Sequence, residues 1–108
     1  GLLIHHISMS DHFSHDDKSI SAINFLKYSD KTWKKYIGSK YNYHNRLRIY
    51  DYYKIFNDLK INILLKDEYI NLKSLEVLNK GFQCDAKYLK QDFRELATSG
   101  LKLIGKFN

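Results

Sequence analysis

Histidine and aspartate side chains gather near the start of the chain, and their types suit metal binding or acid–base chemistry. The cluster comprises His5, His6, Asp11, His12, His15, Asp16 and Asp17. Imidazole and carboxylate groups together bind several divalent ions. The apolar run from Leu2 to Ile7 predicts a short buried strand, and consecutive strand residues point to opposite faces. His5 and His6 would then not share an ion, so we predict no metal site.

Cys84 is the only cysteine, so the chain cannot form an internal disulfide. A single thiol is usually a small buried hydrophobic group, and the lack of a disulfide fits a reducing cytoplasm. No apolar run approaches the ~20 residues that a membrane-spanning helix needs. We therefore expect a cytoplasmic protein with no membrane partner.

The chain is basic, with a formal net charge of +6. Such a charge favours nucleic acid, a membrane surface or an anionic substrate as partner. Lysine and arginine are interleaved with tyrosine between positions 34 and 54, a composition typical of stacking and phosphate contact. A small nucleic-acid-binding module is therefore the alternative function. Basic residues are nevertheless spread along the whole chain, which favours a solvated surface instead.

The order of the predicted elements is that of an α/β protein. A loop follows the first strand, and weak periodicity suggests a helix over Ile20 to Tyr28. Ser29 can cap the next helical turns. The remaining predictions are a loop over Lys40 to Arg48, a helix capped by Asp51, a strand over Ile61 to Leu65, short helices over Leu72 to Leu78 and Tyr88 to Ala97, a break at Gly100, and a strand over Leu101 to Phe107. Ile61, Ile63 and Leu65 alternate with Asn62 and Lys66, so we expect these three side chains to share one buried face. With 108 residues, this is one domain.

Three stretches, in this order, resemble bacterial class I S-adenosylmethionine-dependent methyltransferases of the type 11 kind. The first, after the family's fifth strand, reads DHFSHDDKSISAINFLKYSDKTW (Asp11 to Trp33). The second, before its sixth strand, reads NRLRIYDYYKIF (Asn45 to Phe56). The third, at its final strand, reads ELATSGLKLIGKF (Glu95 to Phe107). The resemblance covers nearly the whole chain and rests on the succession of the three.

The resemblance implies that residues 1–108 are the C-terminal part of a seven-stranded Rossmann-like sheet. The family's strand order, 3-2-1-4-5-7-6, places the last strand between the two before it and antiparallel to both. The chain's final strand should thus lie in the middle of three. The first strand should keep an unpaired edge, which is an aggregation hazard. We therefore expect self-association through that strand.

The family's cofactor, S-adenosylmethionine, is held by a glycine-rich turn in the half of the fold that precedes these strands. The glycines of this chain stand at positions 1, 38, 81, 100 and 105, so no Gly-x-Gly spacing occurs. We expect the 108 residues to be a substrate-side part without a cofactor site of their own. Lys60 stands where relatives usually have a helix-ending glycine. A lysine tolerates the left-handed conformation poorly, so we expect this helix to end differently.

The resemblance also gives candidates for binding the methyl acceptor, which the sequence does not identify. Asp11 and His12 would lie just past the carboxyl end of a strand, where ligands bind in open α/β sheets. His12 could orient or deprotonate the acceptor, or brace the loop through Asp11. The other candidates are Asn24, Asn45, Arg46 and Arg48. An arginine can hold a carboxylate or phosphate, or instead tie the loop to the helix start. Methyl transfer depends mainly on alignment, so no general base is assigned.

Overall fold

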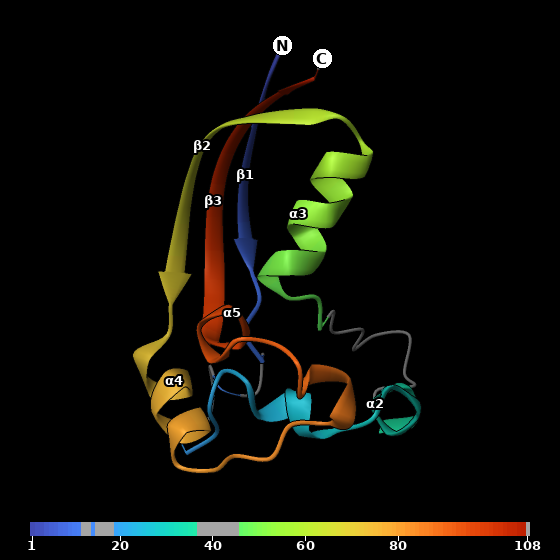
Figure 1. Cartoon of the computed structure of the whole chain (residues 1–108), viewed down its shortest axis with the longest axis vertical. Coiled ribbons are helices and arrows are strands. Elements are labelled where there is room, and N and C mark those ends of the chain that lie inside the picture. The colour runs from blue at the N-terminus through green and yellow to red at the C-terminus, as the bar shows by residue number, and fades with distance from the viewer. Residues whose placement is uncertain (12–13, 15–18, 37–45, 108) are drawn as a thin grey trace.

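The computed structural model describes residues 1–11, 14, 19–36 and 46–107, and it has a mixed α/β fold (Figure 1). Its elements in chain order are β1 (Leu2–Ser8), the 3-10 helix η1 (Asn24–Lys27), α2 (Asp30–Tyr36), α3 (Ile49–Asp58), β2 (Ile61–Ile70), α4 (Leu72–Asn79), the 3-10 helix η2 (Ala86–Tyr88), α5 (Phe93–Ala97) and β3 (Thr98–Phe107).

The three strands form one sheet in the order β1-β3-β2, with β3 antiparallel to both neighbours. This confirms the prediction that the last strand lies between the other two. Leu101 and Leu103, in the middle of β3, are the buried centre of the sheet. The outer edges of β1 and β2 have no neighbouring strand among the described residues.

Helix α3 covers one face of the sheet (Figure 1). Leu101 and Leu103 point to this face and pack with Ile49 and Phe56 of α3. Alternate residues of a strand share a face, so the residues between them point to the opposite face. No helix in the described part of the chain forms a core cluster with that second face, which we call the open face.

The prediction that Ile61, Ile63 and Leu65 share one buried face of β2 was wrong for Leu65. Ile61 is buried and Ile63 is half-buried, whereas Leu65 is exposed. The register shifts between Ile63 and Leu65, so Leu64 is an extra residue. A β-bulge of this kind reverses the alternation that follows it, and Leu65 is turned to the open face.

A second core lies beyond the carboxyl ends of β1 and β2, where the short helices gather (Figure 1). Its buried residues are Ile23, Phe25, Leu26, Trp33, Leu78, Tyr88, Leu96 and Ala97. They come from two segments, one between β1 and α3 and the other between β2 and β3. We call this part the helical cap.

Three predicted helix boundaries were wrong. The helix over Ile20 to Tyr28 shrinks to η1. The helix over Tyr88 to Ala97 is divided into η2 and α5, because the Asp92 carboxylate accepts from the Arg94 N–H and starts a new helix there. Gly100 does not end a helix, since β3 already begins at Thr98.

Helix α3 begins three residues before the position predicted with Asp51 as its N-cap. Arg48 is its N-cap, and the Asp51 carboxylate accepts a hydrogen bond of 2.9 Å from the Arg48 N–H. Asp51 is thus the third residue of the helix rather than its cap.

Ser29 caps the start of another helix, α2, as predicted, since the Ser29 hydroxyl accepts a hydrogen bond from the Thr32 N–H.

Lys60 follows α3 with φ of 58°, the one positive φ at a non-glycine residue in the described chain. The expectation that lysine would make this helix end differently was wrong. The left-handed conformation costs an L-residue about 1–2 kcal/mol, and the chain keeps it. It allows β2 to start immediately at Ile61 and to run back along α3.

Candidate functional site

The chain leaves the sheet at the carboxyl end of β1, where Asp11 is 2% exposed. The Asp11 N–H donates to the Ala22 carbonyl at 2.8 Å. The Asp11 carbonyl accepts from both the N–H and the hydroxyl of Ser14. The backbone at Asp11 is therefore fixed between the end of the strand and the helical cap.

Arg48 is a central tie between the sheet and the cap, because it is fully buried. Its guanidinium donates to the carbonyls of Met9, at the end of β1, and of Leu96, in α5. Its Nε donates to the Arg46 carbonyl at 3.2 Å. Desolvation lowers the pKa of the guanidinium to about 10, yet the group stays charged at neutral pH. One side chain thus joins three segments of the chain.

Arg46 holds the cap together in the same manner. One terminal nitrogen donates to the carbonyls of Phe25, at 2.9 Å, and Tyr28, at 2.6 Å. The other nitrogen lies 2.6 Å from the Asp30 carboxylate. The guanidinium also lies over the rings of Trp33 and Tyr88, at 5.3 and 5.7 Å from their centroids. Cation–π contacts of this length are favourable where water is excluded.

This geometry favours the structural role of both arginines over acceptor binding, since their donors are directed to protein carbonyls and to Asp30.

The same contacts weaken the interpretation of the basic and aromatic stretch between positions 34 and 54 as a nucleic-acid-binding surface. Arg46 and Arg48 point inward, and Tyr50 packs against both cores. The described residues of this stretch do not form one exposed basic surface, so the nucleic-acid alternative gains no support.

Asn24 begins η1 and donates its N–H to the Ser21 carbonyl at 3.1 Å. The next residue, Phe25, is fully buried, and Tyr28 stacks on Trp33 with the rings 20° apart. Packing therefore accounts for both aromatic side chains. The candidates His12 and Asn45 lie outside the described residues.

A pocket of about 290 Å³ adjoins the turn at Asp11. Its lining residues come from the segment after β1 and from the start of α4: Ser14, Ile20, Ala22, Asn71 and Lys73. Ala22 connects the pocket to Asp11, because its carbonyl accepts from the Asp11 N–H. Sequence reasoning missed this pocket, since Asn71 and Lys73 are about sixty positions away from Asp11 in the chain.

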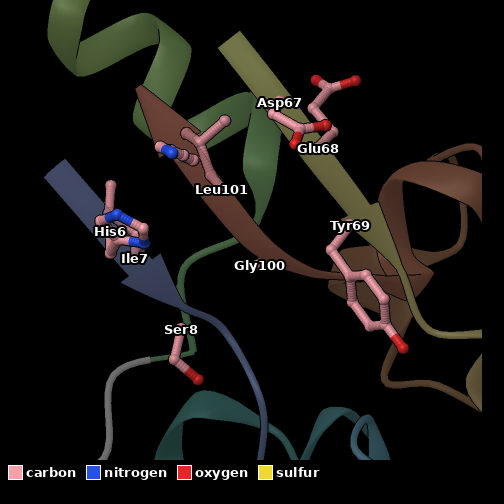
Figure 2. Close-up of a pocket in the computed structure, with 9 residues that line it drawn as sticks. His6, Ile7, Ser8, Asp67, Glu68, Tyr69, Gly100 and Leu101 are labelled. Carbon is pink, nitrogen blue, oxygen red and sulfur yellow. The ribbon is translucent and has the colours of Figure 1, made fainter. Parts of the chain in front are cut away.

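A second, wider hollow of about 430 Å³ lies on the open face (Figure 2). Gly100 of β3 lies in its middle, with His6 of β1 and Tyr69 of β2 on opposite sides. Sequence reasoning missed this hollow as well. The available signal was a glycine next to the alternating residues of the last strand, which we interpreted as a helix break.

The two histidines of β1 point to opposite faces of the sheet, so they do not share an ion. His5 is the register partner of Leu103, on the α3 side, and His6 is the partner of Lys102, on the open face. Within the described residues, no group of three or more potential ligands lies close enough to hold an ion. Cys84 is half-buried, and burial raises the pKa of its thiol, which suits a packing role.

The described residues do not fit the S-adenosylmethionine site of class I methyltransferases. That site requires a glycine-rich turn directly after a strand. Gly100 and Gly105 lie within β3, and Gly81, with φ of 99°, follows α4. None stands where such a turn would lie.

Comparison of the chain with protein-family models, curated proteins and solved structures finds no match. Among the described helices, none is both long and apolar enough to cross a membrane.

Proposed function

We propose that the chain is the C-terminal, substrate-side part of an S-adenosylmethionine-dependent methyltransferase that methylates an acceptor in the cytoplasm. The supporting observation is the strand order β1-β3-β2 with β3 antiparallel to both neighbours. The family's last three strands have this order. Consecutive strands more often lie side by side, so a last strand inserted between two earlier ones is an informative arrangement.

Two local features agree with the proposal. Helix α3 leads from the middle of the chain into β2, as the family's helix does before strand six. Lys60 adopts φ of 58° at the position where relatives usually have glycine. Lys60 therefore adopts a conformation that glycine accommodates best, so the backbone here follows the path that the resemblance implies.

In this proposal, the acceptor binds beside Asp11, in the pocket lined by Ser14, Asn71 and Lys73. The pocket lies past the carboxyl end of β1, the edge at which open α/β sheets bind ligands. Arg46 and Arg48 act indirectly, by fixing the cap that forms its wall. S-adenosylmethionine would supply the methyl group from a preceding half of the enzyme, and the residues of this chain would orient the acceptor.

The test uses the polypeptide of the complete reading frame that contains this chain, incubated with methyl-labelled S-adenosylmethionine and fractionated cell extract. We expect label in at least one fraction, and Lys73→Met, which removes the charged group that lines the pocket, should lower its rate of formation about tenfold or more. Lys54→Met, at an exposed position of α3, is the matched control and should keep the rate. Absence of labelled product from every fraction, or equal rates for both variants, would count against the proposal.

A further inference from the structure

The open face of the sheet carries several exposed apolar side chains and has no cover among the described helices. The side chains that point to it are Leu2, Ile4, His6, Ser8, Asn62, Leu65, Asp67, Tyr69, Lys102, Ile104 and Lys106. Leu2, Ile4 and Tyr69 are each more than 60% exposed. An antiparallel sheet can leave one face to solvent, but exposed apolar side chains that gather on such a face mark an interaction site.

Gly100 leaves the hollow in this face open because it has no side chain. The backbone conformation at this position does not require a glycine. Its φ is not in the left-handed region, and an added Cβ would make an ordinary contact of 3.5 Å with Tyr69 Cβ. Gly105 differs, since a Cβ there would lie 2.7 Å from Ile61 Cγ2. A glycine within a strand weakens it and often marks a place that another group approaches closely.

We propose that the open face binds a second copy of this chain, in a two-fold symmetric dimer of face-to-face sheets. Tyr69 and Gly100 are register partners on adjacent strands, so a protruding ring lies next to a hollow (Figure 2). The two-fold axis lies between the two sheets, midway between β2 and β3 and nearly parallel to both. It places β2 of each copy opposite β3 of the other copy. Each Tyr69 then fills the hollow over Gly100 of the other copy.

The same axis makes the charges complementary. Asp67 and Lys102 are also register partners across β2 and β3. In the dimer, each Asp67 faces Lys102 of the other copy, which gives two equivalent ion pairs. One row further, Leu65 faces Ile104 of the other copy, because these two residues are paired in register as well. Three successive rows thus match under a single operation.

This self-match is the reason for choosing a second copy over an unrelated partner. A two-fold interface requires that one surface carry both halves of every contact. The open face carries the ring with its hollow, the acid with its base, and apolar groups with apolar groups. The proposal does not depend on methyltransferase activity, because it uses only the sheet.

The experiment measures the mass of the chain in solution by sedimentation equilibrium. We expect twice the 12.9 kDa of one chain at high concentration. Tyr69→Ala, which removes the ring, should raise the dissociation constant about tenfold or more. Leu89→Ala is the matched control, since Leu89 is also 65% exposed but lies in the cap, and it should leave the constant unchanged.

A mixing experiment tests the ion pairs between copies. Asp67→Lys gives a chain with two positive groups in this row, and Lys102→Glu gives one with two negative groups. For each variant alone, the dissociation constant of the dimer should rise about tenfold or more. An equimolar mixture should recover dimers, because opposite charges then face each other at both pairs. Recovery on mixing cannot come from contacts within one chain.

Three results would overturn the proposal. The wild-type chain could remain monomeric at concentrations up to about 1 mM. Its dimer could persist in Tyr69→Ala and in both charge variants, which would indicate pairing through the free edge of β1 instead. The mixture could stay as dissociated as its two components, which would show that Asp67 and Lys102 do not meet across the interface.

Discussion

Arg48 donates a hydrogen bond to the main-chain carbonyl of Met9, across 39 positions of the sequence. The bond links the start of α3 to the end of β1. The same guanidinium also reaches Leu96 in α5. The turn that carries Asp11 begins two residues after Met9, so the position of the candidate acceptor site depends on a buried arginine that does not line the acceptor pocket.

Replacement of Arg48 should strongly destabilise the chain. Arg48→Met keeps much of the side-chain volume but removes the donors to Arg46, Met9 and Leu96. Buried carbonyls without partners should lower the free energy of unfolding by about 3 kcal/mol. Arg94→Met, at an exposed position of α5, is the control and should change it by less than about 0.5 kcal/mol. Urea denaturation measures both, and equal effects would contradict the role of Arg48.

Lys60→Gly should stabilise the chain. The φ of 58° at Lys60 costs less for glycine, so the free energy of unfolding should rise by about 0.5–1 kcal/mol, after the greater flexibility of the unfolded glycine is deducted. Lys54→Gly, in the middle of α3, should lower it by about 1 kcal/mol. Thermal melting of both variants is the measurement. A less stable Lys60→Gly chain would mean that the lysine side chain makes a stabilising contact.

The two glycines of β3 should respond differently to alanine. Gly105→Ala places a Cβ 2.7 Å from Ile61 Cγ2, so it should destabilise the chain by about 1–3 kcal/mol. Gly100→Ala meets only an ordinary contact of 3.5 Å and should be neutral or slightly stabilising. Denaturation midpoints of the two variants compare them directly. The reverse order of stability would show that the close approach at Gly105 is absent.

The ion pairs of Asp30 should make stability depend on acidity. The hydrogen bond from Lys87 is the largest cause that lowers the pKa of Asp30, and Arg46 contributes as well. A carboxylate whose pKa is lower in the folded chain than in the unfolded chain stabilises the fold at pH values above the unfolded pKa of ~4. This stabilisation is lost as the pH falls through the pKa of the folded chain. Because the Asp30 side chain is 67% exposed, the gain should be below about 1 kcal/mol.

Asp30→Asn tests this dependence. The variant should be slightly less stable than the wild type at pH 7, and this difference should shrink as the pH falls and Asp30 becomes protonated in the folded chain. Guanidinium denaturation at a series of pH values gives the comparison. A stability difference that stays constant from pH 7 to pH 2 would assign the effect to packing rather than to charge.

The family resemblance implied the order of the three strands, which the structure has, and residue patterns predicted the strands better than their buried faces. Leu101 and Leu103 alternate with Lys102, and this pattern correctly indicated a strand. The exposure of Leu65 was not predictable, because a bulge at Leu64 leaves no mark in an apolar run. Helix boundaries were hard to predict because several nearby residues can each serve as the N-cap. Asp51 lies inside α3 rather than capping it, and Asp92 caps a new helix within the predicted one.

The candidate site was less predictable than the fold. Arg46 and Arg48 have the composition of an anion site, and only the three-dimensional structure shows that their donors are directed to protein carbonyls. Lys73 and Asn71 reach the pocket near Asp11 from another part of the chain, and no local pattern connects them. Side-chain direction and contacts between distant segments are the information that one sequence lacks.

Cofactor binding tests the central claim most directly. The polypeptide of the complete reading frame should be titrated with S-adenosylhomocysteine, the product form of the cofactor, in a calorimeter. The account predicts saturable binding of one molecule per polypeptide, retained in Lys73→Met, which changes only the acceptor pocket. No heat of binding up to about 1 mM ligand would contradict the assignment of this chain to a methyltransferase.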